Sequence, residues 1–202
     1  NNDGLHLVGT DGYRLGLICL DGKKTERIDL LIPAKTLLGV LRGLGDGNVE
    51  LGVDKMRTQV WFRMKNKLIA IRQVVGDFPN YEKILPNAFT TKITVNANEL
   101  LRVMRRMAVF ARQSANVVFW EIDEGVKLST QPGLVGESVS SLDGKVEGDD
   151  LKIAFNYRYF LEYLSVVGDH EITIEFNGPI APTRLLVEGK KDFMQIIMPV
   201  KP

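Results

Sequence analysis

The chain has few of the residues that build covalent or metal-bound frameworks. Its 202 residues include one cysteine, Cys19, and two histidines, His6 and His170. A single thiol excludes a disulfide framework and a zinc site made of several cysteines. The histidines lie far apart in sequence with no cysteine nearby, which argues against a histidine-rich metal centre. We therefore expect no metal and no other cofactor.

Long apolar runs and an excess of one charge are also missing. No apolar run approaches the roughly 20 residues that cross a bilayer, and the polar N-terminus lacks the apolar segment of a signal peptide. Lys and Arg number 26 against 25 Asp and Glu, so the net charge is +1. Any basic surface must therefore be local. We expect a cytoplasmic protein without membrane contact.

Motifs of the common enzyme classes are absent as well. The chain has no Walker loop, no G-x-G-x-x-G after a strand, no G-x-S-x-G and no H-E-x-x-H. The acidic pair Asp149 and Asp150, and His170 beside Asp169, fall in expected turns, where a solvated side chain is the usual situation. We therefore expect no catalytic residues and no enzyme activity.

The sequence does contain a threefold repeat in which a short strand runs into an amphipathic helix. The copies cover residues 28–44, 93–111 and 151–167, and their strand-to-helix corners are Pro33, Asn96 and Asn156. Asn can accept hydrogen bonds from the first turn of a helix, and Pro fits that turn. Strand-like runs with turn signals follow each helix. The pattern predicts an α+β fold, with repeated units of antiparallel sheet and amphipathic helices on one face.

Residues 76–90 contain two prolines and several turn formers, and so predict a boundary between two domains. Residues 89–202 hold two repeat units and have the content of a complete domain. Residues 1–88 hold one repeat unit and a hairpin, and have the content of an incomplete one. The chain also begins without Met and enters a strand pattern almost at once. We therefore expect a preceding part of the protein to be missing.

The expected helix at residues 97–111 separates its charges from its apolar side chains. At about 100° per residue, four arginines share an arc of roughly 120° on the side opposite the aliphatic residues. These four residues, the arginine face, are Arg102, Arg105, Arg106 and Arg112. Helix surfaces more often mix the two signs of charge. The arginine face therefore indicates contact with a polyanion, and a merely solvated surface is the alternative.

The other two expected helices carry weaker charge patterns. In residues 34–44, Lys35 and Arg42 share one side, opposite Leu37, Leu41 and Leu44. In residues 157–167, Arg158 and Glu162 have the spacing of an i,i+4 ion pair on a solvated face.

The C-terminal run at residues 196–200 is apolar and is followed closely by the end of the chain. Pro199 and Pro202 are typical of an edge strand or of a tail that covers a groove. Composition alone leaves two interpretations open, a segment of the core and one wall of a binding cleft.

Four segments together resemble the bacterial DNA polymerase III beta subunit family, the sliding clamps. They are LVGTDGYRLGL at 7–17, GDFPNYEKILP at 76–86, LKIAFNYRYFLEYL at 151–164 and IIMPVKP at 196–202. The resemblance implies the DNA-clamp fold and a homodimeric ring of two head-to-tail subunits, each made of three similar domains. It further implies a non-catalytic protein that encircles double-stranded DNA and tethers polymerases. The residues that would then face DNA are Lys35, Arg42, Arg102, Arg105, Arg106 and Arg112.

The same resemblance implies a groove that accepts short motifs of Gln, Leu and Phe type from DNA polymerase, clamp-loader subunits and repair proteins. The residues implied to line this groove are Thr10, Gly12, Tyr13, Arg14, Leu15, Pro79, Lys83, Ile84, Asn156, Tyr159, Pro179, Ala181, Ile196, Ile197, Met198, Pro199 and Val200. Many members of the family have His in place of Tyr13 and Arg in place of Lys83. The second exchange keeps the charge but loses the bidentate fork.

On this resemblance, residues 1–88 are an incomplete middle clamp domain and residues 89–202 the C-terminal domain, with the first domain absent. The leading hypothesis is a fragment of a sliding clamp. The alternative is a standalone peptide-binding module that sequesters clamp partners without encircling DNA. A third hypothesis is a DNA-binding domain that works through the arginine face directly.

Overall fold

The computed structural model describes residues 4–21, 28–133 and 136–201. These residues form two compact units. The smaller unit holds residues 28–80, and the larger unit holds residues 4–21 together with the described part of 81–201. Both units combine helices with antiparallel sheets, and the α+β class is therefore confirmed.

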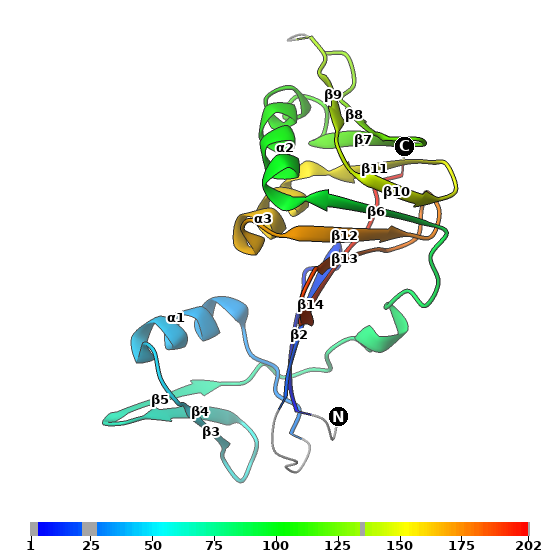
Figure 1. Ribbon diagram of the computed structural model, residues 1–202. Coiled ribbons are helices and arrows are strands. Elements are labelled where there is room, and N and C mark those ends of the chain that lie inside the picture. The colour runs from blue at the N-terminus through cyan, green and yellow to red at the C-terminus, as the bar shows by residue number, and fades with distance from the viewer. Residues whose placement is uncertain (1–3, 22–27, 134–135, 202) are drawn as a thin grey trace. The chain divides into compact units, whose positions relative to one another are not determined.

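The smaller unit contains one helix and a three-stranded sheet of order β3-β4-β5 (Figure 1). The bounds are α1 (Ala34–Leu44), β3 (Glu50–Val53), β4 (Gln59–Met64) and β5 (Lys67–Arg72). Val40 and Leu44 of α1 are buried with Val60, Phe62 and Met64 of β4. The alternate residues of β4 reach this small core because successive side chains of a strand point to opposite faces.

The larger unit contains two antiparallel sheets. The seven-stranded sheet has the order β1-β2-β14-β13-β12-β6-β10, and the four-stranded sheet has the order β11-β7-β8-β9. The bounds of the first sheet are β1 (Leu5–Thr10), β2 (Arg14–Leu20), β6 (Thr91–Asn96), β10 (Lys145–Gly148), β12 (Glu171–Phe176), β13 (Thr183–Val187) and β14 (Lys190–Ile197). Those of the second sheet are β7 (Val117–Ile122), β8 (Val126–Ser129), β9 (Val139–Leu142) and β11 (Leu151–Asn156). A 3-10 turn, η1 (Tyr81–Lys83), precedes β6.

Helices α2 (Ala97–Ala111) and α3 (Tyr157–Val167) lie side by side on one side of this unit (Figure 1). One continuous core joins both helices to both sheets. At its centre the rings of Trp120, Phe155 and Phe160 contact one another, and the centroids of Trp120 and Phe160 are 5.0 Å apart. All three side chains are at most 1% exposed. Large buried aromatic side chains dominate core energetics, so this cluster anchors α3 to the four-stranded sheet.

Two of the three predicted strand-to-helix corners are confirmed. The Asn96 side chain accepts hydrogen bonds from the backbone N–H groups of Asn98 and Glu99, and that of Asn156 accepts one from Arg158. The strand predicted at residues 28–33, before Pro33, is wrong, because these residues form no strand. Leu31 accepts one backbone hydrogen bond, from Val74, but its own N–H donates to the side chain of Gln73.

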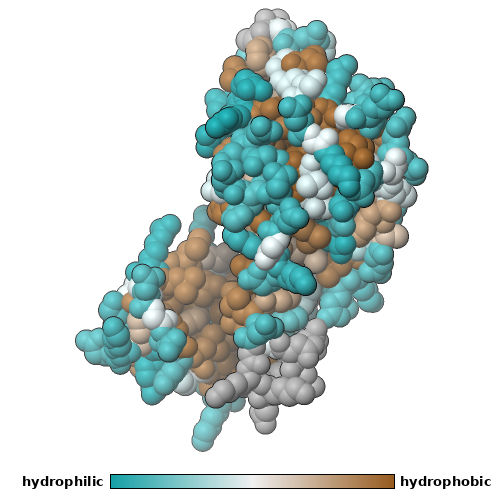
Figure 2. Space-filling view, in the orientation of Figure 1, coloured by the Kyte–Doolittle hydropathy of each residue, from teal (hydrophilic) through white to brown (hydrophobic). Residues whose placement is uncertain are grey.

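Three further differences concern exposure and strand order. Leu41 was expected on the buried side of α1 but is 49% exposed, and apolar surface is visible on the smaller unit in Figure 2. The C-terminal run at residues 196–200 was expected to be an edge strand or a tail that covers a groove. The first of these is wrong, because β14 pairs with β13 on one side and with β2 on the other. Strands β9 and β10 were not predicted, and only Leu142 of the two is buried.

We expect Phe160→Ala to destabilise the larger unit by about 3–5 kcal/mol, because the truncation leaves a cavity in a fully buried aromatic cluster. Guanidinium denaturation followed by circular dichroism measures the effect. The matched control is Val166→Ala on the same helix, whose side chain is 73% exposed. An equal effect of the two substitutions would contradict the proposed role of the cluster.

Candidate functional site

The arginine face occupies the solvent side of α2. Arg102, Arg105, Arg106 and Arg112 are all exposed, whereas Leu100, Met104 and Met107 on the opposite side are completely buried. In the residues that the structure describes, none of the four guanidinium groups forms an ion pair with a protein carboxylate. The surface over α2 is correspondingly hydrophilic in Figure 2. Four neighbouring cations without a protein counterion favour binding of an external anion.

Lys35 and Arg42 belong to α1 in the smaller unit. Both side chains are exposed, and neither forms an ion pair with the described residues. Arg42 lies in the last turn of α1, where a cation also interacts favourably with the helix dipole. These two residues are therefore accessible, although Arg42 also has a local structural role.

The turn between β1 and β2 holds several of the residues implied to line a groove. The Thr10 hydroxyl donates to the Arg14 carbonyl over 2.7 Å and accepts from the Gly12 N–H. The Asp11 carboxylate accepts from the backbone N–H groups of Tyr13 and Arg14 at 3.0 and 3.1 Å. Gly12 has a φ of +88°, a conformation that side chains with a Cβ rarely adopt. Hydrogen bonds from the side chains of Thr10 and Asp11 therefore hold the turn, and Gly12 occupies its positive-φ position.

Arg14 is held by two carboxylates and one ring. Its Nε lies 3.0 Å from Oδ2 of Asp11, and its Nη1 lies 2.7 Å from Oε2 of Glu162 on α3. The guanidinium carbon is 4.9 Å from the centroid of the Tyr159 ring, a cation–π geometry. The expected pair of Glu162 with Arg158 is wrong, because Glu162 reaches the β1–β2 turn instead.

The contacts in this cluster shift the pKa values of Asp11, Arg14 and Tyr159. Partial burial alone would raise the pKa of Asp11, but the hydrogen bonds from Tyr13 and Arg14 outweigh it and lower that pKa. Burial likewise opposes the charge of Arg14, yet Glu162 and Asp11 raise its pKa. Burial also raises the pKa of Tyr159. The contacts therefore favour the charged forms of Asp11 and Arg14.

Tyr13 and Tyr159 form the exposed aromatic part of this site. Their rings are stacked with centroids 6.4 Å apart and an interplanar angle of 16°. Tyr13 is 64% exposed, whereas Tyr159 is half-buried. The Tyr13 carbonyl accepts a hydrogen bond of 2.9 Å from the N–H of Met198. The C-terminal segment therefore begins directly beside the β1–β2 turn.

The C-terminal residues divide into core and surface. Ile196 and Ile197 are at most 1% exposed and Leu15 is 3% exposed, so their side chains lie in the core below the surface. Met198, Pro199 and Val200 are half-buried, and the N–H of Val200 donates to the carbonyl of Ala154. Of the two interpretations of the tail, core therefore applies up to Ile197, and the following residues lie at the surface.

The remaining candidate groove residues lie at several places. Asn156 caps α3 and is half-buried, and Ala181 is half-buried in the loop between β12 and β13. Lys83 ends η1, Ile84 follows it, and both are exposed. Pro79 is exposed and belongs to the smaller unit. All candidates except Pro79 thus lie in the larger unit.

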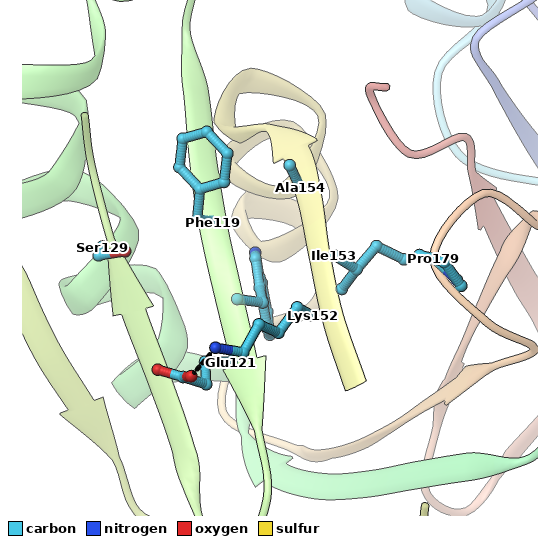
Figure 3. A pocket seen from close by; sticks show the side chains of 8 residues that line it. Phe119, Glu121, Ser129, Lys152, Ile153, Ala154 and Pro179 are labelled. Atoms are coloured by element: carbon cyan, nitrogen blue, oxygen red, sulfur yellow. Dashed lines mark ion pairs between the residues drawn. The ribbon is translucent and has the colours of Figure 1, made fainter. Parts of the chain in front are cut away.

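Pro179 lines a cavity of about 320 Å³ on the four-stranded sheet (Figure 3). Phe119 of β7 and Ala154 of β11 are paired neighbours in this sheet and also line it. Lys152 forms an ion pair of 2.5 Å with Glu121 at its side. The other lining residues are Trp120, Ser129 and Ile153. Because Ala154 binds Val200 through its backbone, this cavity adjoins the C-terminal segment.

Asp11, Ala154 and Glu162 were not among the sequence-predicted site residues. Asp11 precedes Gly12 in a recognisable turn signal and bonds to Arg14 within that turn. Nothing local indicates the bond of Glu162 to Arg14, because these two residues are far apart in the chain. Within the described ranges, no group of three or more His, Cys, Asp and Glu residues could hold a metal ion. None of the described helices is both long enough and apolar enough to cross a membrane.

Comparison with known proteins gives consistent matches over nearly the whole chain. A model of the DNA polymerase III beta subunit central domain matches residues 1–80, and one of its C-terminal domain matches residues 82–201. The beta sliding clamp of Bacillus subtilis is 29% identical over 200 residues, which are 96% of this chain and 53% of that protein. The chain thus spans about half the length of the curated relatives that it matches.

Solved structures of DNA polymerase III beta subunits also resemble this chain over its whole length. The beta chain of DNA polymerase III from Streptococcus pneumoniae superimposes with a TM-score of 0.93 at 29% identity, over all of this chain and 55% of that one. The beta subunit from Thermotoga maritima superimposes with a TM-score of 0.92 at 26% identity, over all of this chain and 56% of that one.

We expect the Tm of the Asp11→Asn variant to fall less than that of the native chain as the pH is lowered from 6 to 2. Because the folded state lowers the pKa of Asp11, its stabilising contribution is present above the unfolded value of about 3.9 and is lost as the pH falls through the folded value. The Tm of the native chain should exceed that of the variant at pH 6, and the two should converge toward pH 2. Asp143→Asn, at an exposed aspartate, is the control. Parallel profiles for the native chain and Asp11→Asn would contradict the assignment.

Proposed function

Because the chain belongs to the DNA polymerase III beta subunit family, we propose that it acts as part of a sliding clamp that encircles duplex DNA. The beta sliding clamps are non-catalytic processivity factors of DNA polymerase III, and this chain is a non-catalytic member of the family. Matches to consecutive domains over nearly the whole chain favour a clamp over a standalone peptide-binding module. A cytoplasmic location follows from this role, since bacterial chromosomes are replicated there.

The arginine face is the observation that carries the DNA-binding part of the proposal. Its four cations are exposed and lack protein counterions in the described residues. Cations of this kind contact phosphates without reading bases. A clamp needs such contacts, because base-specific ones would stop it from sliding. Lys35 and Arg42 would contribute to the same function from α1.

The second part of the proposal is a peptide-binding groove in the larger unit. Tyr13, Arg14, Tyr159 and Met198 come together through hydrogen bonds and ring contacts, and combine apolar surface with a few polar groups. Peptide sites commonly have this composition. DNA polymerase and clamp-loader subunits would insert short linear motifs here. Leu15, Ile196 and Ile197 would support the groove from below.

The third part of the proposal concerns assembly and domain organisation. We propose that the intact protein forms a homodimeric ring, with residues 1–88 as the C-terminal portion of the middle domain and residues 89–202 as the C-terminal domain. These boundaries stay a prediction. The boundary between the two matched domain models, at residues 80 and 82, is close to the predicted one.

We expect the double substitution Arg105→Glu, Arg106→Glu to weaken binding of the chain to a short DNA duplex. Loss of two phosphate contacts should reduce the slope of log affinity against log salt by about two. Fluorescence anisotropy at several salt concentrations measures both quantities. The control is Lys190→Glu, Lys191→Glu, which changes charge equally at exposed positions outside α2. An effect of the control as large as that of the α2 variant would exclude a specific role of the arginine face.

We expect a labelled peptide that carries a short motif of Gln, Leu and Phe type to bind the chain, and Met198→Ala and Tyr13→Ala each to weaken binding about tenfold. The reason is loss of apolar contact area worth about 1–2 kcal/mol. Anisotropy titration measures the affinities, with Val166→Ala on the exposed side of α3 as control. Absence of binding to the folded native chain would overturn the proposed groove.

A further inference from the structure

We propose that Glu162, together with Asp11, positions the Arg14 guanidinium in the groove, and that this cluster selects peptides whose contacting residue is uncharged rather than acidic. The inference rests on the proposed peptide-binding function and goes beyond it. It names a positioning residue on α3 and a charge preference of the ligand.

Arg14 is fixed from two directions by contacts within the larger unit. Its Nε donates to Asp11 in its own turn, and its Nη1 donates to Glu162, which comes from a distant part of the chain. The Tyr159 ring faces the guanidinium carbon at 4.9 Å. A planar group held by two carboxylates and a ring has few orientations left, so its remaining N–H groups point in fixed directions.

Those remaining donors are available to a ligand. A guanidinium has five N–H donors, and Asp11 and Glu162 use one each. The other three have no acceptor in the part of the chain that the structure describes. The Arg14 side chain is 27% exposed, which leaves part of it in reach of solvent. Main-chain carbonyls and side-chain amides are acceptors that could satisfy these donors without adding charge.

The charge of the cluster determines which acceptors are favoured. Two carboxylates and one guanidinium leave a net charge of −1 on Asp11, Arg14 and Glu162. A carboxylate on the ligand would approach one cation that two anions already neutralise. Like charges a few ångströms apart repel, so an aspartate or glutamate should bind less well here than its neutral amide.

In the described part of the chain, no ion pair with a neighbour on α3 explains the position of the Glu162 side chain. It lies one turn after Arg158 on α3, yet no ion pair joins the two in the described residues. Its side chain is 63% exposed, so Glu162→Gln leaves no buried charge unpaired and should fold. Loss of a partly exposed ion pair of this kind should weaken peptide binding about two- to fivefold.

The test combines ligand and protein variants. Each residue of a binding peptide is replaced in turn by Asn and by Asp, and anisotropy gives the affinity ratio at every position. With the native chain, at least one position should show about threefold or greater preference for Asn over Asp. Glu162→Gln should abolish this preference, and Glu162→Asp should keep most of it. Glu99→Gln, at an exposed glutamate of α2, is the matched control.

A second measurement does not depend on the peptide. The Nε–Hε resonance of Arg14 in a ¹⁵N-labelled chain should exchange slowly in the native protein and more rapidly in Glu162→Gln. An unchanged resonance would overturn the positioning role, and an unchanged Asn-to-Asp ratio would overturn the charge preference. If the native chain binds no peptide while the resonance responds to Glu162→Gln, the groove proposal fails and the positioning of Arg14 stands.

Discussion

The antiparallel pairing of β2 with β14 is the contact on which the proposed groove depends. It joins the beginning of the chain to its end, with Arg14 opposite Ile197 and Leu15 opposite Ile196. This register buries Leu15, Leu17 and Ile196 together, and it leaves Tyr13 beside Met198 just beyond the paired residues. A shift by one residue would turn every side chain of β2 to the other face. The burial of one face of this pair therefore also determines which side chains form the site.

The proposed groove also depends on helix α3, which must lie at a fixed distance from the β2–β14 pair. The Trp120, Phe155 and Phe160 cluster attaches the inner face of α3 to the four-stranded sheet. The outer side of the same helix carries Tyr159 and Glu162 to the β1–β2 turn. Core packing on one side of α3 thus sets the geometry of a polar contact on its other side.

Local features of the fold could be predicted from the sequence, whereas contacts between distant segments could not. Asn96 and Asn156 mark helix starts because a capping side chain bonds to the residues that follow it directly. The division of α2 into an apolar and a basic face also follows from spacing alone. Spacing suggested Arg158 as the partner of Glu162, but the true partner, Arg14, depends on where β2 lies in the sheet.

The two errors about strands have the same origin. A segment is a strand only when its backbone is paired with a neighbouring strand. Residues 28–33 have an apolar composition but form no strand, and the N–H of Leu31 donates to the side chain of Gln73 instead of to a backbone carbonyl. The prolines near the C-terminus suggested an edge strand or a tail that covers a groove. The edge strand is wrong, because Pro199 lies beyond the last paired residue, Ile197, and leaves β14 free to pair on both sides. Composition indicates that a segment can be a strand, and only the partners decide whether it is one.

The two proposed surfaces differ in how they use charge, and the difference suits their tasks. The arginine face concentrates cations without protein counterions in the described residues, so that its attraction to phosphates is long-ranged and indifferent to orientation. At Arg14, by contrast, two carboxylates cancel the charge and leave only directed N–H donors. An ordered cation that is paired with carboxylates discriminates between ligands by hydrogen-bond geometry, which recognition of a short motif requires. A cluster of cations without protein counterions does not discriminate in this way, and sliding along DNA requires this lack of discrimination.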